Sequence, residues 1–281
     1  MMDKEGSEGQ KEIATKGGEA SMMAVLGQAE GLFVASLTAP LCWVVREPDG
    51  SFRARNGSAF FLDAGEGPFC VTACHVIEGL RQACASENVV AFQLGNLPID
   101  FKGRHSIIAE HKGLDIATFR VSTDEIASIG KTVLTGYQEA WPPRPPDQNR
   151  GIYYAGFPGV ERRLSLPSEI SFGVAAGGGV ANSVSETDIS SLIERENLIP
   201  VLGRGLPPEN YDFGGMSGGP MLSVIETRGL RSWALAGVIY QGPNTSSNPD
   251  EAIAGLEIIK ARRAYFIQPD GRLDIQRWDS R

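Results

Sequence analysis

Short apolar runs, each ended by residues that favour turns, constrain the fold of this chain more than any other feature. The chain contains 34 glycines and 17 prolines, and Asp49-Gly50 is a typical hairpin signal. Runs this short suit strands better than helices and predict an all-β barrel or sandwich. The expected strands are Trp43–Val45, Gly57–Leu62, Phe69–Ala73, Val89–Leu94, Ser106–Ala109, Ile116–Val121, Ile152–Gly156, Glu169–Ala175, Pro220–Ile225 and Trp233–Tyr240.

Few segments predict anything other than strands or turns. Residues 22–38 fit either a short helix or an entry strand, and Val76–Leu80 fits a single helical turn. Residues 181–210 are polar and predict a loop, with at most a short helix near 190–197. Asn248-Pro249-Asp250 precedes a stretch with Lys260, Arg262 and Arg263 near its end, which predicts a helix over Glu251–Arg263.

Charge and hydropathy exclude several functions. The net charge of -8 argues against nucleic acid as a partner, because phosphate binding needs a basic surface. The apolar stretch from Met22 to Val45 is interrupted by polar residues and Pro40, so it does not predict a membrane span. The first residues lack the basic and apolar regions of a secretory signal. We therefore expect a cytoplasmic protein with no membrane partner.

The cysteines do not predict a metal site or a disulfide. The four are Cys42, Cys70, Cys74 and Cys84, with no Cys-x-x-Cys pair and His75 as the nearby imidazole. We expect four reduced thiols in or near the core, no metal and no cofactor.

Three segments carry the chemistry, and they occur in the order His, Asp, Ser. They are Val71-Thr72-Ala73-Cys74-His75-Val76, Leu114-Asp115-Ile116-Ala117 and Gly214-Gly215-Met216-Ser217-Gly218-Gly219-Pro220. That order is one of those in which a nucleophilic serine, its general base and an orienting carboxylate occur along a chain. Each segment lies beside an expected strand.

With these motifs the chain resembles the trypsin/chymotrypsin-like serine peptidases, and especially the bacterial branch that includes the HtrA-type proteases. The resemblance covers roughly Pro40 to Tyr240. It implies two six-stranded-type antiparallel barrels with a C-terminal helix and an active site in the cleft between them. The expected organisation is a disordered tail (1–20), a barrel with His75 and Asp115 (21–128), a Pro-rich linker (129–150), and a barrel with Ser217 plus the helix (151–281). No PDZ domain is expected.

The resemblance also assigns roles. Ser217 is expected to attack the carbonyl, His75 to act as general base and then acid, and Asp115 to orient His75. The backbone N–H groups of Gly215 and Ser217 match the oxyanion-hole donors of the family. Met216 stands where zymogen-activated relatives carry an aspartate that receives a freed N-terminus, so activation of that kind is not expected.

Two neighbouring residues offer alternatives to this assignment. His111 precedes Asp115 by four residues, but it lacks the Thr-Ala-x-His context and reads as a solvated loop residue. Cys74 is adjacent to His75, but neighbouring side chains on a strand point to opposite faces, which argues against a cysteine nucleophile.

The specificity pocket implied by the resemblance has its floor near Tyr211 and Asp212. Its wall falls at Tyr240, Gln241 and Gly242. If Tyr211 fills the floor, small or medium apolar side chains are expected at the cleaved bond. If Asp212 points inward, Arg or Lys is expected.

The predicted function is that of a serine endopeptidase acting on a protein or peptide substrate. Two rivals stay open: a catalytically latent binding module with a protease fold, and an esterase-like or self-processing hydrolase. A regulatory partner acting through residues 181–210 also stays open.

Overall fold

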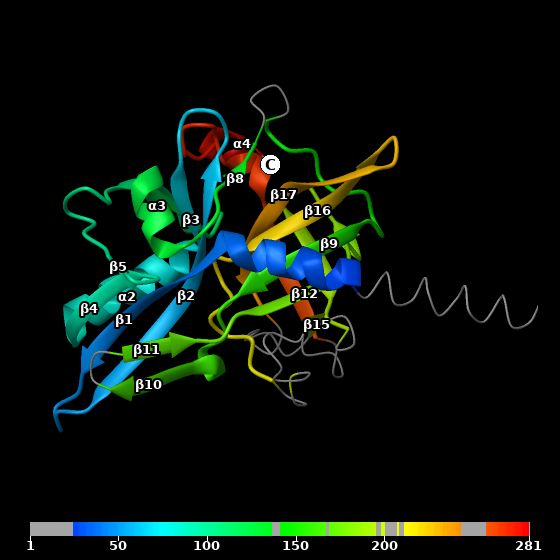
Figure 1. Ribbon diagram of the computed structural model, residues 1–281. Helices are drawn as coiled ribbons and strands as arrows, with labels where there is room; N and C mark the ends of the chain where they lie inside the picture. Colours follow the sequence, from blue (N-terminus) through cyan, green and yellow to red (C-terminus); the bar gives the residue numbers. More distant parts are fainter. Residues whose placement is uncertain are drawn as a thin grey trace, which may run out of the picture.

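The computed structural model describes residues 25–136, 141–166, 169–194, 198–199, 207, 211–242 and 257–280. Nearly all of its strands belong to two antiparallel sheets, which lie side by side with a helix (25–37) across one of them (Figure 1). The all-β class predicted from the spacing of apolar runs is confirmed. The tail at 1–20 falls outside the described residues.

The first sheet has the strand order β5-β4-β1-β2-β3-β7-β6, and β8 pairs in parallel with β2. Its long hairpin is formed by β1 and β2, which turn at Gly50 as predicted. The strands are β1 (Thr38–Arg46), β2 (Phe52–Asp63), β3 (Phe69–Thr72), β4 (Asn88–Leu94), β5 (Leu97–Pro98), β6 (Ile107–His111), β7 (Ile116–Arg120) and β8 (Leu134–Thr135).

The second sheet has the order β13-β14-β18-β17-β16-β9-β12-β15, and β10 and β11 form a separate two-stranded ribbon. These strands are β9 (Gly151–Gly156), β10 (Arg162–Leu166), β11 (Glu169–Phe172), β12 (Ala175–Val180), β13 (Ser183–Val184), β14 (Asp188–Leu192), β15 (Leu198–Ile199), β16 (Pro220–Thr227), β17 (Leu230–Gln241) and β18 (Ile258–Arg263).

The helices are short. Besides helix 25–37 they are α2 (Cys74–Ser86), α3 (Thr123–Ile129) and α4 (Ile275–Asp279), with 3-10 turns at Gly159–Glu161 and Ala264–Phe266. Helix α3 begins at a capping box formed by Ser122 and Glu125 and ends at the left-handed Gly130. Among the described residues, no helix is long and apolar enough to cross a bilayer.

Three apolar clusters hold the fold together. One joins the first sheet to its helices and includes Phe61 of β2 and Ile77 of α2, and one lies within the second sheet and includes Ile152 and Ile259. The third joins both sheets, because Phe60 of β2 belongs to the same cluster as Leu222 of β16. Helix 25–37 contributes Val34 and Leu37 to this shared core. Burial of these side chains fixes the two sheets against each other.

The predicted helix over Glu251–Arg263 is wrong in its described part. Residues 258–263 form β18, which pairs with β14 on one side and β17 on the other. The segment is a strand because its apolar side chains alternate with period two: Ile259 and Ala261 point into the core of the second sheet. The C-terminal helix is instead the five-residue α4.

Other element predictions needed smaller corrections. The turn expected at Val76–Leu80 is the middle of the 13-residue α2. The strand expected over Glu169–Ala175 breaks after Phe172, because β11 turns back onto β10 while β12 joins the second sheet. The loop expected from 181 onward contains β13 and β14. The undecided segment 22–38 is helical over 25–37.

Candidate active site

His75 and Asp115 form a two-point contact. His75 is the second residue of α2, which starts directly after β3, so the strand delivers the imidazole to the end of the sheet. The imidazole Nδ1 lies 2.7 Å from Asp115 Oδ2, and the backbone N–H of His75 donates to Asp115 Oδ1 at 2.9 Å. The carboxylate therefore fixes both the position of the ring and the tautomer that keeps Nε2 available as a base.

Asp115 reaches this position through a tight turn between β6 and β7. Its φ is +54°, in the left-handed region that aspartate tolerates better than most residues. The turn is closed by a hydrogen bond from Asp115 N–H to Lys112 O at 3.1 Å. The buried Arg262 guanidinium donates from Nε to Leu114 O at 2.9 Å. The second sheet thus supports the loop that presents Asp115.

Ser217 lies on a turn that contacts the first sheet. Its carbonyl accepts a hydrogen bond from Ser58 N–H at 2.8 Å. The following Gly218 has φ +90°, and a Cβ there would stand 2.0 Å from Ser58 O and 2.9 Å from Ala73 N. Only glycine fits this close approach, which brings the serine turn next to the segment that leads into His75.

The backbone amides of the turn fall into two groups. The N–H groups of four residues donate hydrogen bonds within the protein, and these residues are Gly214, Met216, Gly218 and Gly219. Those of Gly215 and Ser217 donate none to any part of the chain that the structure describes. These two backbone donors are available to an anionic group, which is what stabilisation of a developing oxyanion requires.

The Ser217 hydroxyl is hydrogen-bonded to a backbone carbonyl. Its Oγ donates to Tyr240 O at 3.4 Å, and no hydrogen bond joins it to His75 in the described residues. In ligand-free enzymes the hydrogen bond between nucleophile and base is often long and tightens only when substrate binds.

The other two histidines have structural contacts. His105 is fully buried, with Nδ1 accepting from Asp100 N–H and Nε2 3.1 Å from Glu125 Oε1. His111 accepts from Leu114 N–H at 3.1 Å, and its ring is edge-on to Trp278. His111 is thus a half-buried part of the turn before Asp115, not the solvated residue that we expected.

Cys74 is unsuited to act as a nucleophile. It is 2% exposed, and burial raises the pKa of its thiol to about 11, with a further increase from the nearby carboxylates of Glu78 and Asp115. The thiolate, which is the reactive form, is therefore scarce near neutral pH. All four cysteines are unbridged, and Cys84 is the exposed one.

The residues expected to form the specificity pocket have distinct surroundings. Tyr211 is buried against Phe213, and its hydroxyl donates to Glu161 Oε1 at 3.0 Å. Asp212 is exposed, and its Oδ1 accepts Gly214 N–H at 2.7 Å. The neighbouring wall residues Tyr240 and Gln241 are half-buried at the end of β17, and Gly242 is buried beside Phe213.

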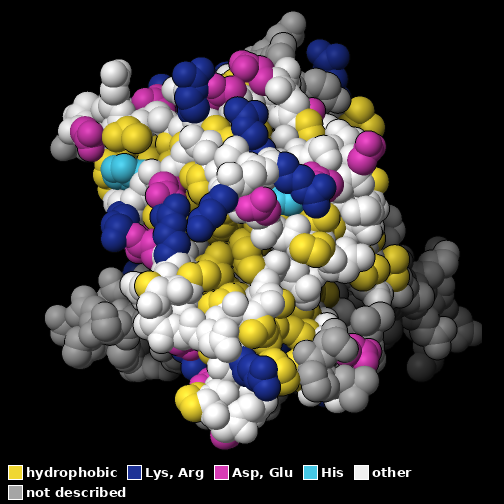
Figure 2. Space-filling view, turned by 90° about the vertical axis from the view of Figure 1, so that its left-hand side faces the viewer, with side chains coloured by type: hydrophobic (Ala, Val, Ile, Leu, Met, Phe, Trp, Pro, Cys, Tyr) yellow, Lys and Arg dark blue, Asp and Glu magenta, His cyan; other side chains and the backbone are white. Residues whose placement is uncertain are grey.

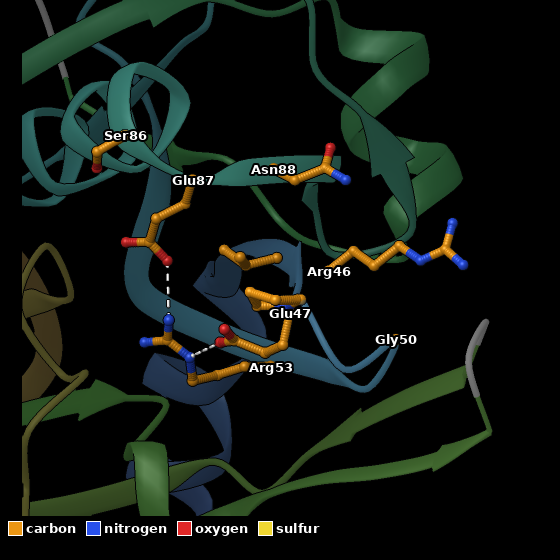
Figure 3. Close-up of a pocket in the computed structure, with 9 residues that line it drawn as sticks. Arg46, Glu47, Gly50, Arg53, Ser86, Glu87 and Asn88 are labelled. Atoms are coloured by element: carbon orange, nitrogen blue, oxygen red, sulfur yellow. Dashed lines mark hydrogen bonds and ion pairs between the residues drawn. The ribbon is translucent and has the colours of Figure 1, made fainter.

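A separate hollow lies at the far end of α2, lined by residues of the β1–β2 hairpin and Ser86, Glu87 and Asn88 (Figure 3). Its volume is about 530 Å³. Arg53 inside it is ion-paired with Glu47 and Glu87, so its charge is already compensated. With a rise of ~1.5 Å per residue, Ser86 is roughly 16 Å along the helix from His75. This hollow is distinct from the candidate site.

The molecular surface carries mixed charge. On the face in Figure 2, Lys and Arg side chains alternate with Asp and Glu over the upper half, and hydrophobic side chains form a band below them. Ion pairs such as Arg81–Glu110 and Lys112–Glu78 have this mixed character. Within the described ranges, no group of three or more His, Cys, Asp or Glu side chains is arranged to hold a metal ion.

Two residues beside the site were missed from the sequence. Arg262 was assigned to a helix end, and Ser58 was included in an apolar strand without a role. Ser58 carried a usable signal, because a polar side chain inside the run Gly57–Leu62 must find buried partners. Arg262 carried none, because its contacts depend on how the two sheets pack.

Comparisons with known proteins give little beyond the geometry. Neither protein-family models nor curated proteins match the sequence. Among solved structures, the chain is similar to the serine protease domain of Sesbania mosaic virus polyprotein, with 14% sequence identity and a TM-score of 0.37. The match covers 82% of this chain and 95% of the viral one.

Proposed function

We propose that this protein is a serine endopeptidase of the trypsin-like class, with Ser217 as nucleophile, His75 as general base and Asp115 as orienting carboxylate. One observation carries the proposal. The His75–Asp115 pair lies beside a glycine-rich turn on which the N–H groups of Gly215 and Ser217, and only those two of residues 214–219, are unpaired within the described chain. The candidate general base and the candidate oxyanion donors therefore belong to the same site, at Ser217.

In the acylation half of the reaction, Ser217 Oγ forms a bond to the carbonyl carbon as its proton passes to His75 Nε2. The carbonyl oxygen becomes an oxyanion and accepts hydrogen bonds from Gly215 and Ser217 N–H. The imidazolium, stabilised by Asp115, then gives its proton to the leaving amine as the C–N bond breaks. In the second half, water takes the place of the amine, its proton goes to His75, and the acid product leaves with Ser217 reprotonated.

A fluorophosphonate probe tests the proposal directly. Phosphonylation of Ser217 requires the activated hydroxyl but no knowledge of the natural substrate. We expect stoichiometric labelling that is lost in Ser217→Ala and His75→Ala, with the modified peptide containing Ser217. Absence of labelling on folded wild-type protein would contradict the proposal.

The hydrogen bond of the Ser217 hydroxyl to Tyr240 O supports a second candidate, a latent protease-fold protein that binds peptides without cleaving them. The hydroxyl contacts Tyr240 O in place of His75. A latent protein would bind peptides yet resist the probe, so the same experiment separates the two. A panel of matched peptide and ester substrates then distinguishes an endopeptidase from an esterase-like hydrolase, and mass spectrometry of the incubated chain detects self-processing.

For specificity we propose small or medium apolar residues at the cleaved bond. The Tyr211 hydroxyl is fixed by Glu161, which favours a closed floor, and Asp212 uses one carboxylate oxygen within its own turn. Cleavage-site sequencing on a mixed peptide library should give cuts after Ala, Val or Leu. Cuts mainly after Arg or Lys would show that Asp212 faces the substrate.

A further inference from the structure

We propose that Ser58 is a positioning residue for the turn of residues 214–219, called the oxyanion turn below. It holds this turn in the conformation that leaves the N–H groups of Gly215 and Ser217 free to bind an oxyanion. Ser58 belongs to β2 of the first sheet, whereas the turn belongs to the second half of the chain. The inference rests on the proposed hydrolase function and adds a residue that the triad and oxyanion motif do not include.

Every polar atom of Ser58 has a partner, and three of the four partners lie across the sheet boundary. Its hydroxyl donates to Gly215 O at 2.8 Å and accepts from Phe157 N–H at 2.8 Å. Its own N–H donates to Ser217 O at 2.8 Å, and its carbonyl accepts from Thr72 Oγ1 at 2.7 Å. The residue is fully buried. The hydroxyl thus satisfies one acceptor and one donor of the backbone, and its single proton is used.

These contacts restrain the peptides on which the oxyanion donors depend. Gly215 has φ +103°, and a glycine in this region can rotate its flanking peptides with little steric resistance. On one side, Gly159 N–H donates to Gly214 O at 2.6 Å. Because a trans peptide directs its C=O and N–H to opposite sides, this bond turns Gly215 N–H away from Gly159. On the other side, Ser58 Oγ holds Gly215 O.

Ser58 also holds the strand end that supplies the first restraint. Phe157, which donates to Ser58 Oγ, lies two residues before Gly159. The Ser58 N–H fixes the carbonyl of Ser217, the residue that carries the nucleophile. Ser58 therefore holds three backbone groups relative to the first sheet, which also supplies His75, and its hydroxyl accounts for two of them. Electrostatic stabilisation of an oxyanion depends on such preorganisation, because donors that must reorient during the reaction contribute less.

The alternative is that Ser58 is a buried serine of structural importance only. Thr118 of β7 offers a matched control, since it lies in the same sheet, is fully buried and donates its hydroxyl to the carbonyl of Gly271, far along the chain from the serine turn. Removing the Thr118 hydroxyl leaves Gly271 O without its donor, and removing the Ser58 hydroxyl leaves Gly215 O and Phe157 N–H unpaired, so both changes should lower stability. Of these two residues, Ser58 is the one that contacts residues of the oxyanion turn.

The experiment compares Ser58→Ala and Ser58→Gly with Thr118→Val in the full-length protein. Thermal unfolding is measured first, and kinetics are then recorded at a temperature at which all variants are folded. We expect both Ser58 variants to lose about ten- to a hundred-fold in kcat with KM little changed. The loss should be smaller than the ~10²–10³ that follows removal of an oxyanion donor itself. Thr118→Val should keep the wild-type kcat at a similar loss in unfolding temperature.

A wild-type kcat in Ser58→Gly or Ser58→Ala, with Ser217→Ala inactive, would overturn the positioning role and leave the proposed function intact. Equal kcat losses in the Ser58 and Thr118 variants would also overturn it, because stability alone would then explain them. If Ser58→Ala does not fold, Ser58→Thr retains the hydroxyl and should restore a kcat well above that of Ser58→Gly. Wild-type protein that neither hydrolyses peptides nor reacts with fluorophosphonate would contradict the proposed function itself.

Discussion

At the scale of single residues, the candidate triad predicts how far kcat falls when each of its members is replaced. Ser217→Ala and His75→Ala should each lower kcat by up to ~10⁶, and the double variant should lose little more, because nucleophile and base act as a unit. Asp115→Asn should lose on the order of 10⁴ through the wrong imidazole tautomer. Steady-state kinetics measure all four. Unchanged turnover after Ser217→Ala would contradict the mechanism.

A second residue-scale prediction concerns the thiols. Because burial raises the pKa of Cys74 to about 11, its thiol stays protonated at pH 8, and iodoacetamide should react first with the exposed Cys84. We expect peptidase activity to survive that modification and also the Cys74→Ala exchange. Mass spectrometry locates the label. Inactivation in parallel with alkylation of Cys74 would indicate a cysteine nucleophile instead.

At the scale of elements, β18 links the two halves of the site through Arg262. The guanidinium is ion-paired with Asp188 at 2.9 Å and lies over the rings of Tyr240 and Trp278, each at 4.8 Å, while it donates to Leu114 O. Arg262→Met should lower the free energy of unfolding by about 3 kcal/mol, because it leaves Asp188 without its partner and Leu114 O without a donor. Denaturant titration measures this loss.

Arg53→Met is the control for Arg262. Arg53 also forms two ion pairs, with Glu47 and Glu87, but its side chain is 45% exposed, so solvent already screens its charge. We expect a much smaller change in unfolding free energy. Equal losses in the two variants would show that burial of Arg262 does not matter for stability.

At the scale of the whole molecule, helix 25–37 makes a prediction about which part of the N-terminal segment the fold requires. Helix 25–37 buries Val34 and Leu37 in the core shared by the sheets, and its buried Glu30 is ion-paired with Arg231 at 2.9 Å. A chain beginning at Ser21 should keep wild-type stability and activity. A chain beginning at Thr38 should unfold at markedly lower temperature, because it exposes that core. Calorimetry and a peptidase assay on both chains test this, and a large activity loss in the first with normal folding would contradict it.

The sequence by itself determined the all-β class and most strands, which follow from local physics: short apolar runs with turn residues at their ends. The pairing of His75 with Asp115 was implied by the resemblance of the three motifs to those of serine peptidases, and the two side chains are in contact.

Tertiary structure alone decided the rest. The sequence of residues 258–263 predicts the end of a helix, but in the structure its backbone is hydrogen-bonded to two neighbouring strands. Strand pairing of this kind overrides a weak local preference for helix. The contacts of Arg262 and Ser58 join residues 148 and 157 positions apart, to Leu114 and Gly215 respectively. No local pattern encodes such distances, because each contact exists only once burial of the shared core has set one sheet against the other.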